Sequence, residues 1–152
     1  MESCPDIWNV FHDATILKAS GAIQQDVVLR LECDYLRDRF EEPGSEFLLK
    51  LVACSTFEFE LWGDAPDVIT DVQLIGSLRL WILSAEPMDD HCKIHCARHV
   101  RDAVGGTLRV AATSAGLRLD SGRSVSLAEI KEVASDYWTE FSSSKPDDSG
   151  PV

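Results

Sequence analysis

The sequence predicts a mainly β protein: an antiparallel sandwich or barrel of about eight to ten short strands, with one C-terminal helix packed on the sheet. Two observations lead to this class. Apolar and polar residues alternate along several short segments, which is the period of a half-buried strand. One segment near the C-terminal end has instead the spacing and start signal of an amphipathic helix. The chain has 152 residues, of which 45% are hydrophobic and 26% charged, a composition typical of a globular domain.

The clearest alternation lies in residues 27–35, where apolar side chains occupy every second position. The same period predicts strands over 47–51, 57–61 and 78–83. In the last of these, Trp81 faces away from the side that carries the core residues, and a strand with apolar groups on both faces is expected to lie centrally.

Two shorter strands, over residues 6–11 and 14–19, are expected to pair as an opening hairpin around His12 and Asp13. Residues 68–75 alternate like a strand but follow a proline that favours a short helix, so both alternatives stay open.

Further short strands are predicted over 92–97, 107–112 and 116–120. The sequence TSAG between the last two has a turn composition and is expected to join them as a hairpin. That hairpin would pair Arg109 with Asp120.

Ser126 and Glu129 form a capping box, the signature of a helix start. The apolar residues that follow at helical spacing are Leu127, Ile130, Ala134, Tyr137 or Trp138, and Phe141. Residues 142–152 are polar and rich in Pro, Gly and Ser, so we expect a single globular domain over 1–141 and a disordered tail.

The formal net charge is −12, so most of the surface would repel a phosphate backbone, and we expect no nucleic-acid binding. An acidic surface favours a basic protein partner through long-range attraction, while solubility alone is the simpler alternative. Glu32, Asp34, Glu58 and Glu60 are the predicted partner surface. An exposed sheet edge would also allow a homodimer.

Five cysteines (Cys4, Cys33, Cys54, Cys92 and Cys96) cannot all pair within one chain. The first residues lack the basic and apolar regions of a signal peptide, and no stretch approaches the ~18 apolar residues of a membrane span. We therefore expect a reduced, cytoplasmic protein without a membrane segment.

The most conspicuous cluster of metal-ligating residue types is HCKIHCARH at 91–99. His91, His95 and His99 are candidate metal ligands, although a strand would bring only His91 and His95 to one face. The alternative is structural, with Cys92 and Cys96 facing the core as small apolar residues and the histidines facing water.

The same region is the net-positive part of the chain. Arg98 and Arg101, with Gly105 and Gly106 nearby, are a candidate anion site because glycines let backbone N–H groups approach an anion. A turn with solvated charges explains the same residues, because no phosphate-binding fingerprint is present.

Trp81, Tyr137 and Trp138 are candidates for the wall of a ligand cavity between sheet and helix, or for an interface. Packing of the helix on the sheet is the structural alternative. The sequence carries no recognisable nucleophile motif, and we expect no catalytic residue and no cofactor.

Four short motifs carry a resemblance: WxxFHD (8–13), DYLR (34–37), FEF (57–59) and YW (137–138). They resemble small bacterial proteins without assigned activity. The acidic, tryptophan-bearing single domain also resembles the immunity proteins of bacterial toxin systems, which implies an inhibitor that binds a protein.

The leading hypothesis is therefore a non-enzymatic binding protein whose acidic surface engages a basic protein partner. The alternatives are a small-ligand-binding β-rich protein, with its cavity at the aromatic residues, and a metal-binding protein that uses the 91–99 cluster.

Overall fold

The strands form one unclosed, antiparallel ten-stranded sheet in the computed structural model, which describes residues 4–63, 67–98 and 104–144. The strand order is β10-β9-β3-β2-β1-β6-β7-β8-β4-β5. The bounds are β1 (Thr15–Gly21), β2 (Val27–Glu32), β3 (Glu46–Val52), β4 (Thr56–Leu61), β5 (Val68–Ile69), β6 (Leu80–Pro87), β7 (Cys92–Arg98), β8 (Gly106–Ala111), β9 (Ser114–Leu119) and β10 (Ser124–Val125). The predicted class, mainly β with a C-terminal helix packed on the sheet, is confirmed.

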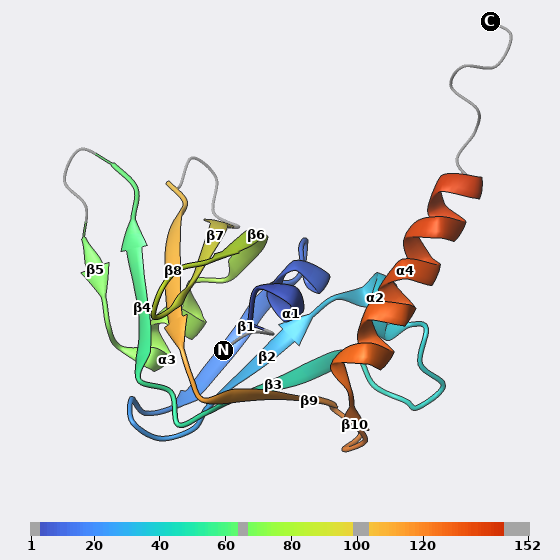
Figure 1. Ribbon diagram of the computed structural model, residues 1–152, viewed down its shortest axis with the longest axis horizontal. Coiled ribbons are helices and arrows are strands. Elements are labelled where there is room, and N and C mark those ends of the chain that lie inside the picture. Colours follow the sequence, from blue (N-terminus) through green and yellow to red (C-terminus); the bar gives the residue numbers. More distant parts are fainter. Residues whose placement is uncertain (1–3, 64–66, 99–103, 145–152) are drawn as a thin grey trace, which may run out of the picture.

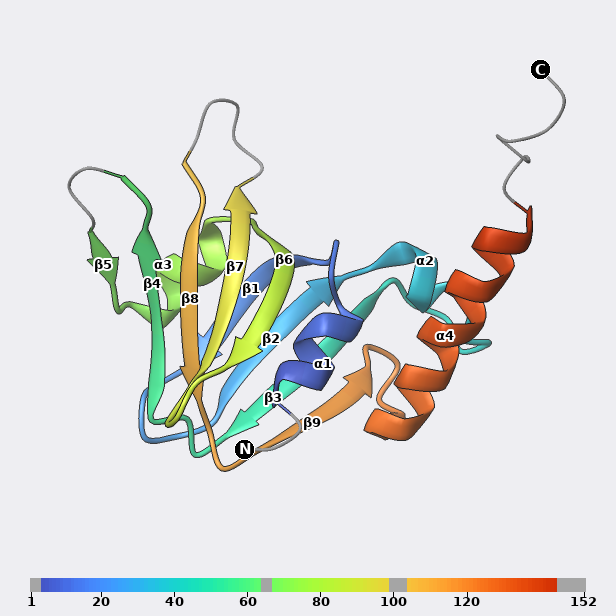
Figure 2. The same ribbon diagram turned by 45° about the horizontal axis from the view of Figure 1, so that its top comes forward.

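The sheet has two halves that meet at a short join between β1 and β6 (Figure 1). We call β10-β9-β3-β2-β1 the first half-sheet and β6-β7-β8-β4-β5 the second half-sheet. Only Thr15 and Trp81 are paired in register across the join, and the Asp13 N–H donates to Ile82 O at 2.7 Å beside them. Because the join is short, the halves diverge, and helices fill the space between them (Figure 2).

Helix α1 (Cys4–Val10) stands where the first strand of a hairpin was predicted, so that prediction is wrong. Ile7, Trp8 and Phe11 are all buried. One helical face carries all three side chains, whereas a strand would turn Ile7 and Trp8 to opposite sides. The Asn9 side-chain amide hydrogen-bonds the backbone of β6 as both donor and acceptor, at 3.1 and 3.0 Å, which fixes α1 against the second half-sheet.

The second strand is shorter than the sequence predicts. β2 ends at Glu32, and helix α2 (Asp34–Arg37) follows instead of a strand that continues to Tyr35. Cys33 and Leu36 are both buried, and the Leu36 N–H donates to Cys33 O at 3.2 Å. Their spacing of three residues suits one turn of helix, and this turn places Tyr35 on the side that faces the C-terminal helix.

Residues 68–75 contain both of the alternatives left open by the sequence. After β5, Asp71 caps helix α3 (Val72–Ser77) by accepting a hydrogen bond from the Leu74 N–H at 3.1 Å. The helix packs on β1 at Gly76, where a Cβ would lie 2.2 Å from the Ala19 nitrogen. The close approach of helix to strand therefore requires glycine at this position.

The predicted hairpin between the strands around TSAG does not form. β8 pairs with β7 and β4, whereas β9 pairs with β3 and β10, so the connection crosses from one half-sheet to the other. Arg109 lies opposite Glu58 in the β4–β8 register and not opposite Asp120. The connection is at residues 112–113, and Ser114, Ala115 and Gly116 of the predicted turn already belong to β9.

Helix α4 (Leu127–Ser144) begins at the predicted capping box, where the Glu129 N–H donates to the Ser126 hydroxyl at 3.1 Å. Ile130 and Ala134 are buried against the rest of the molecule. The helix continues to Ser144, so the first three residues of the predicted tail are helical, and residues 145–152 lie outside the described part of the chain. None of the described helices is long and apolar enough to cross a membrane.

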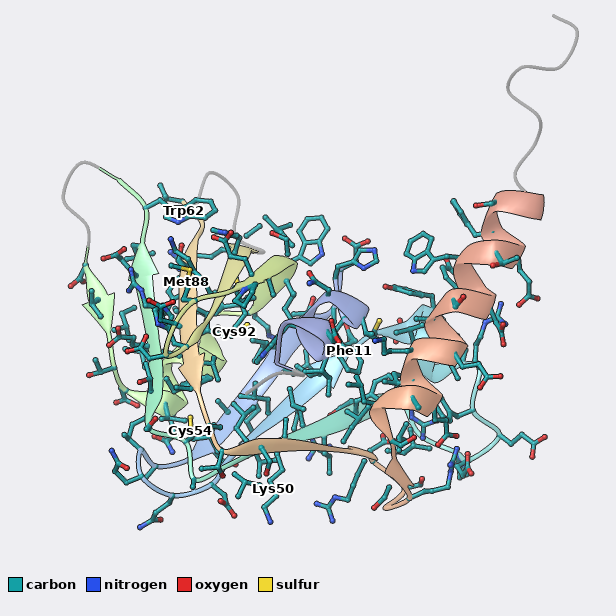
Figure 3. The ribbon with its side chains drawn as sticks, in the orientation of Figure 1. Phe11, Lys50, Cys54, Trp62, Met88 and Cys92 are labelled. Carbon is teal, nitrogen blue, oxygen red and sulfur yellow. The ribbon has the colours of Figure 1, made fainter. Side chains whose placement is uncertain are left out.

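The core lies on the inner face of both half-sheets. Phe11 lies between α1 and the strands, whereas Lys50 of β3 extends from the outer face (Figure 3). Cys92 and Cys96 of β7 are buried as predicted. The cysteines whose side chains are described are all buried and form no disulfide with one another: Cys33, Cys54, Cys92 and Cys96.

Candidate functional site

One hollow is lined by residues of α2 and α4, the end of β2 and the first residue of β1. Figures 1 and 2 show α2 and α4 at the end of the molecule farthest from β4 and β5. The volume of the hollow is about 510 Å³, which is within the usual range for binding pockets. We call it the acidic cleft, and its lining residues are Asp13, Thr15, Glu32, Cys33, Asp34, Tyr35, Tyr137, Trp138 and Phe141.

Aromatic rings form one wall of the acidic cleft. Tyr35 of α2 lies 4.5 Å from Tyr137 and 5.7 Å from Trp138, measured between ring centroids. Phe141 lies 5.6 Å from Trp138 in an edge-to-face arrangement and leaves 47% of its surface exposed. Behind this wall the His12 ring stacks on Trp138 at 5.1 Å, with an interplanar angle of 20°. The rings support one another at the separations that aromatic pairs favour, so the wall is preformed.

Three carboxylates also line the acidic cleft. Asp13 follows α1, Glu32 ends β2 and Asp34 begins α2. Within the described part of the chain, neither Glu32 nor Asp34 has a Lys or Arg partner, and the carboxylate of Asp13 is paired with the imidazole of His12 at 3.8 Å. No Lys or Arg is among the lining residues, so the cleft presents negative charge that the described chain does not neutralise.

Two ionisable groups at the base of the acidic cleft are held in their neutral forms. Burial, with a smaller contribution from the charges of Asp13 and Asp34, raises the pKa of the Cys33 thiol to about 11. Burial likewise raises the pKa of Tyr35, whose hydroxyl donates to His12 O at 2.8 Å. At neutral pH the cleft therefore holds a thiol and not a thiolate, which makes Cys33 a poor nucleophile.

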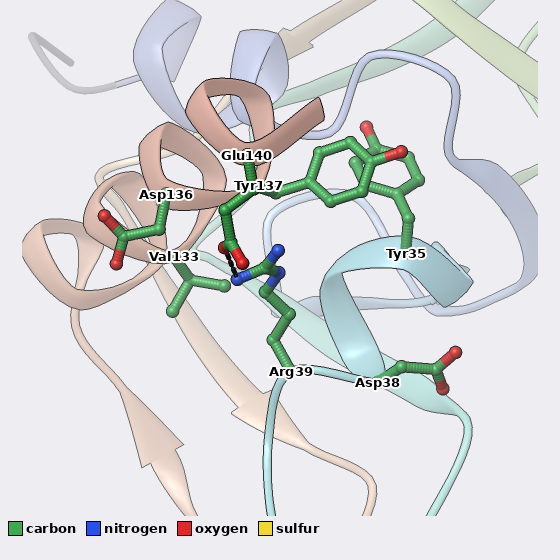
Figure 4. A pocket seen from close by; sticks show the side chains of 7 residues that line it. All are labelled: Tyr35, Asp38, Arg39, Val133, Asp136, Tyr137 and Glu140. Atoms are coloured by element: carbon green, nitrogen blue, oxygen red, sulfur yellow. Dashed lines mark ion pairs between the residues drawn. The ribbon is translucent and has the colours of Figure 1, made fainter. Parts of the chain in front are cut away.

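A second hollow of about 620 Å³ shares Tyr35 and Tyr137 with the acidic cleft (Figure 4). Here Arg39 forms an ion pair with Glu140 of α4, and its guanidinium carbon lies 5.5 Å from the centroid of the Tyr137 ring. This hollow therefore already contains a cation between a carboxylate and an aromatic ring.

A buried ion pair holds α2 in position beneath the rings. The Arg37 side chain is only 1% exposed, and its Nη2 donates to Asp120 Oδ1 at 2.8 Å. The same guanidinium donates to the carbonyl oxygens of Glu42, Pro43 and Glu46. Because this guanidinium has a partner on every side, the short helix that carries Tyr35 is fixed to the first half-sheet.

The structure separates the four carboxylates predicted as one partner surface. Glu32 and Asp34 line the acidic cleft, but Glu58 and Glu60 lie on β4 in the second half-sheet. Arg109 of β8 contacts both of the latter, at 3.6 Å and 2.9 Å. The four carboxylates therefore do not form one cluster, because β1, β6, β7 and β8 lie between β2 and β4 in the sheet.

The three aromatic candidates are also divided. Tyr137 and Trp138 line the acidic cleft, whereas Trp81 is absent from its lining and is 36% exposed on β6. Trp81 is opposite the core side of its strand, as predicted, since its neighbours Leu80 and Ile82 are fully buried.

The histidine cluster does not gather a metal site within the described residues, where no group of three or more His, Cys, Asp or Glu side chains is placed to hold an ion. His91 contacts Asp90 at 2.7 Å, and His95 contacts Glu86 at 3.4 Å. His99, the third predicted ligand, lies outside the described residues.

The predicted anion site is only partly described. Arg98 ends β7, and its Nε is buried without a hydrogen-bond partner in the described structure, but Arg101 lies outside the described residues. Gly105 and Gly106 pack closely against neighbouring backbone and do not form a turn that is open to an anion. A Cβ at Gly105 would lie 2.5 Å from Cys96 O, and one at Gly106 would lie 2.4 Å from Glu60 O.

Sequence reasoning missed Asp13, Tyr35 and Phe141 as members of the acidic cleft. Asp13 is expected between the two strands of the opening hairpin, and it does occupy a turn, with a positive φ of 73° that Asp tolerates. The turn follows a helix instead of a strand, and it places the Asp13 carboxylate in the same cleft as Glu32. No protein-family model, curated protein or solved structure matches the chain.

Proposed function

We propose that this protein is a non-enzymatic binding protein that engages a basic protein partner through the acidic cleft and the surface around it. The concrete form that fits the sequence resemblance is an immunity-type inhibitor of a basic toxin. The observation that carries this proposal is a cleft lined both by packed aromatic rings and by the carboxylates Asp13, Glu32 and Asp34, with no Lys or Arg among its described lining residues.

Charge complementarity supports a cationic partner over a neutral one. The whole chain has a net charge of −12, which attracts a basic molecule over a distance of about one Debye length, roughly 8–10 Å. On β4, by contrast, Glu58 and Glu60 are paired with Arg109. Binding at the acidic cleft would relieve unpaired negative charge, whereas binding at β4 would have to compete with Arg109.

Binding is favoured over nucleophilic catalysis by the state of the cleft thiol. A thiol with a pKa near 11 is almost entirely protonated at neutral pH. The adjacent carboxylates add negative charge, which opposes formation of a thiolate.

The test uses the full chain immobilised and panned against a random peptide library displayed on phage. We expect the recovered peptides to carry net positive charge. Their affinity for Glu32→Gln/Asp34→Asn should fall about tenfold, since two attractive charges are removed.

The matched control is Glu58→Gln/Glu60→Gln, which removes the same amount of negative charge from β4. Its affinity for the recovered peptides should stay within about twofold of the unaltered chain. Peptides of neutral or acidic composition, or equal losses in the two double variants, would refute the proposal, because equal losses indicate only non-specific attraction to a negative surface.

A further inference from the structure

We infer that the acidic cleft is a receptor for one arginine side chain of the partner, held between the aromatic wall and the carboxylates. This inference rests on the proposed function and names the chemistry of the contact. The guanidinium would pack against the exposed ring of Phe141 and against its neighbour Trp138, while its N–H groups donate to Glu32 and Asp34.

The molecule already holds one guanidinium in the same way beside the cleft. Arg39 lies over Tyr137 and pairs with Glu140 in the adjoining hollow (Figure 4). The acidic cleft has the same two components, a wall that includes Tyr137 and a set of carboxylates, but no cation among its described lining residues. The two hollows therefore differ chiefly in that the arginine of one is supplied by the chain itself.

The size and composition of the acidic cleft favour arginine over lysine. Four aromatic residues line a volume of about 510 Å³, which is large enough for a planar group between the walls. A guanidinium is planar and weakly hydrated, so it stacks on rings and binds a carboxylate through two parallel hydrogen bonds. An ammonium group is a compact and strongly hydrated charge that gains less from an aromatic wall.

The aromatic wall also separates this site from a simple acidic patch. Phe141 and Trp138 contact each other edge to face at 5.6 Å, and Tyr137 and Phe141 are nearly parallel at 6.1 Å. An acidic patch attracts Lys and Arg about equally, because both carry one positive charge. A preference for arginine that depends on these rings is the property that distinguishes a guanidinium receptor.

The experiment titrates the full chain with Nα-acetyl-arginine amide, Nα-acetyl-lysine amide and Nα-acetyl-citrulline amide, and follows the tryptophan indole N–H resonances by NMR. Trp138→Phe assigns the Trp138 signal. We expect arginine to shift that signal saturably and to bind about three- to tenfold more tightly than lysine. Citrulline, which has the same shape without the charge, should cause no shift.

Two variants remove the rings without changing the charge. Trp138→Leu, and the more exposed Phe141→Leu as a substitution that disturbs packing less, should each reduce the preference for arginine. Trp62→Leu, which removes an exposed tryptophan at the far end of the sheet, is the matched control and should leave the preference unchanged.

Equal affinity for arginine and lysine, or an arginine preference that survives Trp138→Leu and Phe141→Leu, would overturn the inference. In that event the proposed function would still stand if basic peptides lost affinity for Glu32→Gln/Asp34→Asn. If the affinity of those peptides were also unchanged by that double substitution, both the arginine receptor and the proposed function would be refuted.

Discussion

Arg37 and Asp120 form the interaction on which the position of α2 depends most. The guanidinium is buried, whereas Asp120 also accepts hydrogen bonds from the backbone N–H groups of Ser45 and Glu46. Burial alone would raise the pKa of Asp120, but the Ser45 N–H, the Arg37 side chain and the Glu46 N–H together lower it below its ordinary value of 3.8. The pair therefore stabilises the fold at every pH at which Asp120 is ionised.

Asp120→Asn should lower the free energy of unfolding by about 3 kcal/mol at neutral pH, because it leaves the Arg37 charge buried without its counter-ion. Since the folded-state pKa of Asp120 is lowered, its contribution is complete above 3.8 and is lost as the pH falls through the folded value. The difference between the two proteins should therefore shrink on acidification below pH 3.8. Urea unfolding of both proteins across a pH series measures this difference in the free energy of unfolding.

The control for this prediction is Lys50→Gln, which breaks the exposed ion pair between Lys50 and Asp26. Both side chains are about half exposed and the Nζ–Oδ2 distance is 3.4 Å, so the loss should be below about 1 kcal/mol. A loss for Asp120→Asn as small as that for Lys50→Gln would show that the buried pair does not hold α2 in place.

Single residues of the acidic cleft were predictable where the signal was local. Glu32 and Asp34 were identified because they lie in an acidic segment, and Tyr137 and Trp138 because they follow a capping box at helical spacing. The ion pairs of Glu58 and Glu60 with Arg109 were not predictable. They depend on the pairing of β4 with β8, and these two strands are far apart in the sequence. Arg109 was instead assigned to Asp120 by turn composition, and Asp120 pairs with Arg37.

At the scale of elements, the period of hydrophobicity predicted strands better than helices shorter than two or three turns. The sequence predicts strands for α1 and for the first residues of α2, because a few apolar residues fit the two-residue period of a strand as well as the period of a helix. The helix α4 was predicted because its capping box and long apolar stripe are independent signals that agree. Local sequence does not predict which strands pair. The connection at residues 112–113, for example, joins two strands that lie in different half-sheets.

Gly76→Ala tests the contact between α3 and β1. The new Cβ would lie 2.2 Å from the Ala19 nitrogen and 2.8 Å from the Ala19 Cβ, so the helix must move away from the strand. We expect a loss of roughly 1–3 kcal/mol, although alanine is the better helix former at an unconstrained position. Thermal or urea unfolding measures the change.

Gly116→Ala is the matched control for this substitution, because nothing lies within 4 Å of the position of its Cβ. Its effect on stability should lie within about 0.5 kcal/mol of zero. If Gly76→Ala were as neutral as Gly116→Ala, α3 would not be packed on β1 as closely as described.

At the scale of the whole molecule, the two half-sheets have different electrostatic character. In the second half-sheet, Glu58 and Glu60 are paired with Arg109. The opposite end, formed by α2, α4, the start of β1 and the end of β2, carries the aromatic wall and carboxylates without a described Lys or Arg partner. Composition alone gives the net charge of −12. The positions of the carboxylates that have no cationic partner depend on the fold. We therefore expect a cationic partner to bind more tightly at the acidic cleft than at β4, where Arg109 already pairs with the carboxylates.

The most direct test of this account is hydrogen–deuterium exchange of the full chain with and without a basic peptide recovered by panning. The account predicts slower exchange around residues 12–15, 32–35 and 137–141, which carry the acidic cleft, and no change in β4 and β8. Slower exchange confined to β4 and β8, or spread evenly over both half-sheets, would contradict the assignment of the acidic cleft as the binding site.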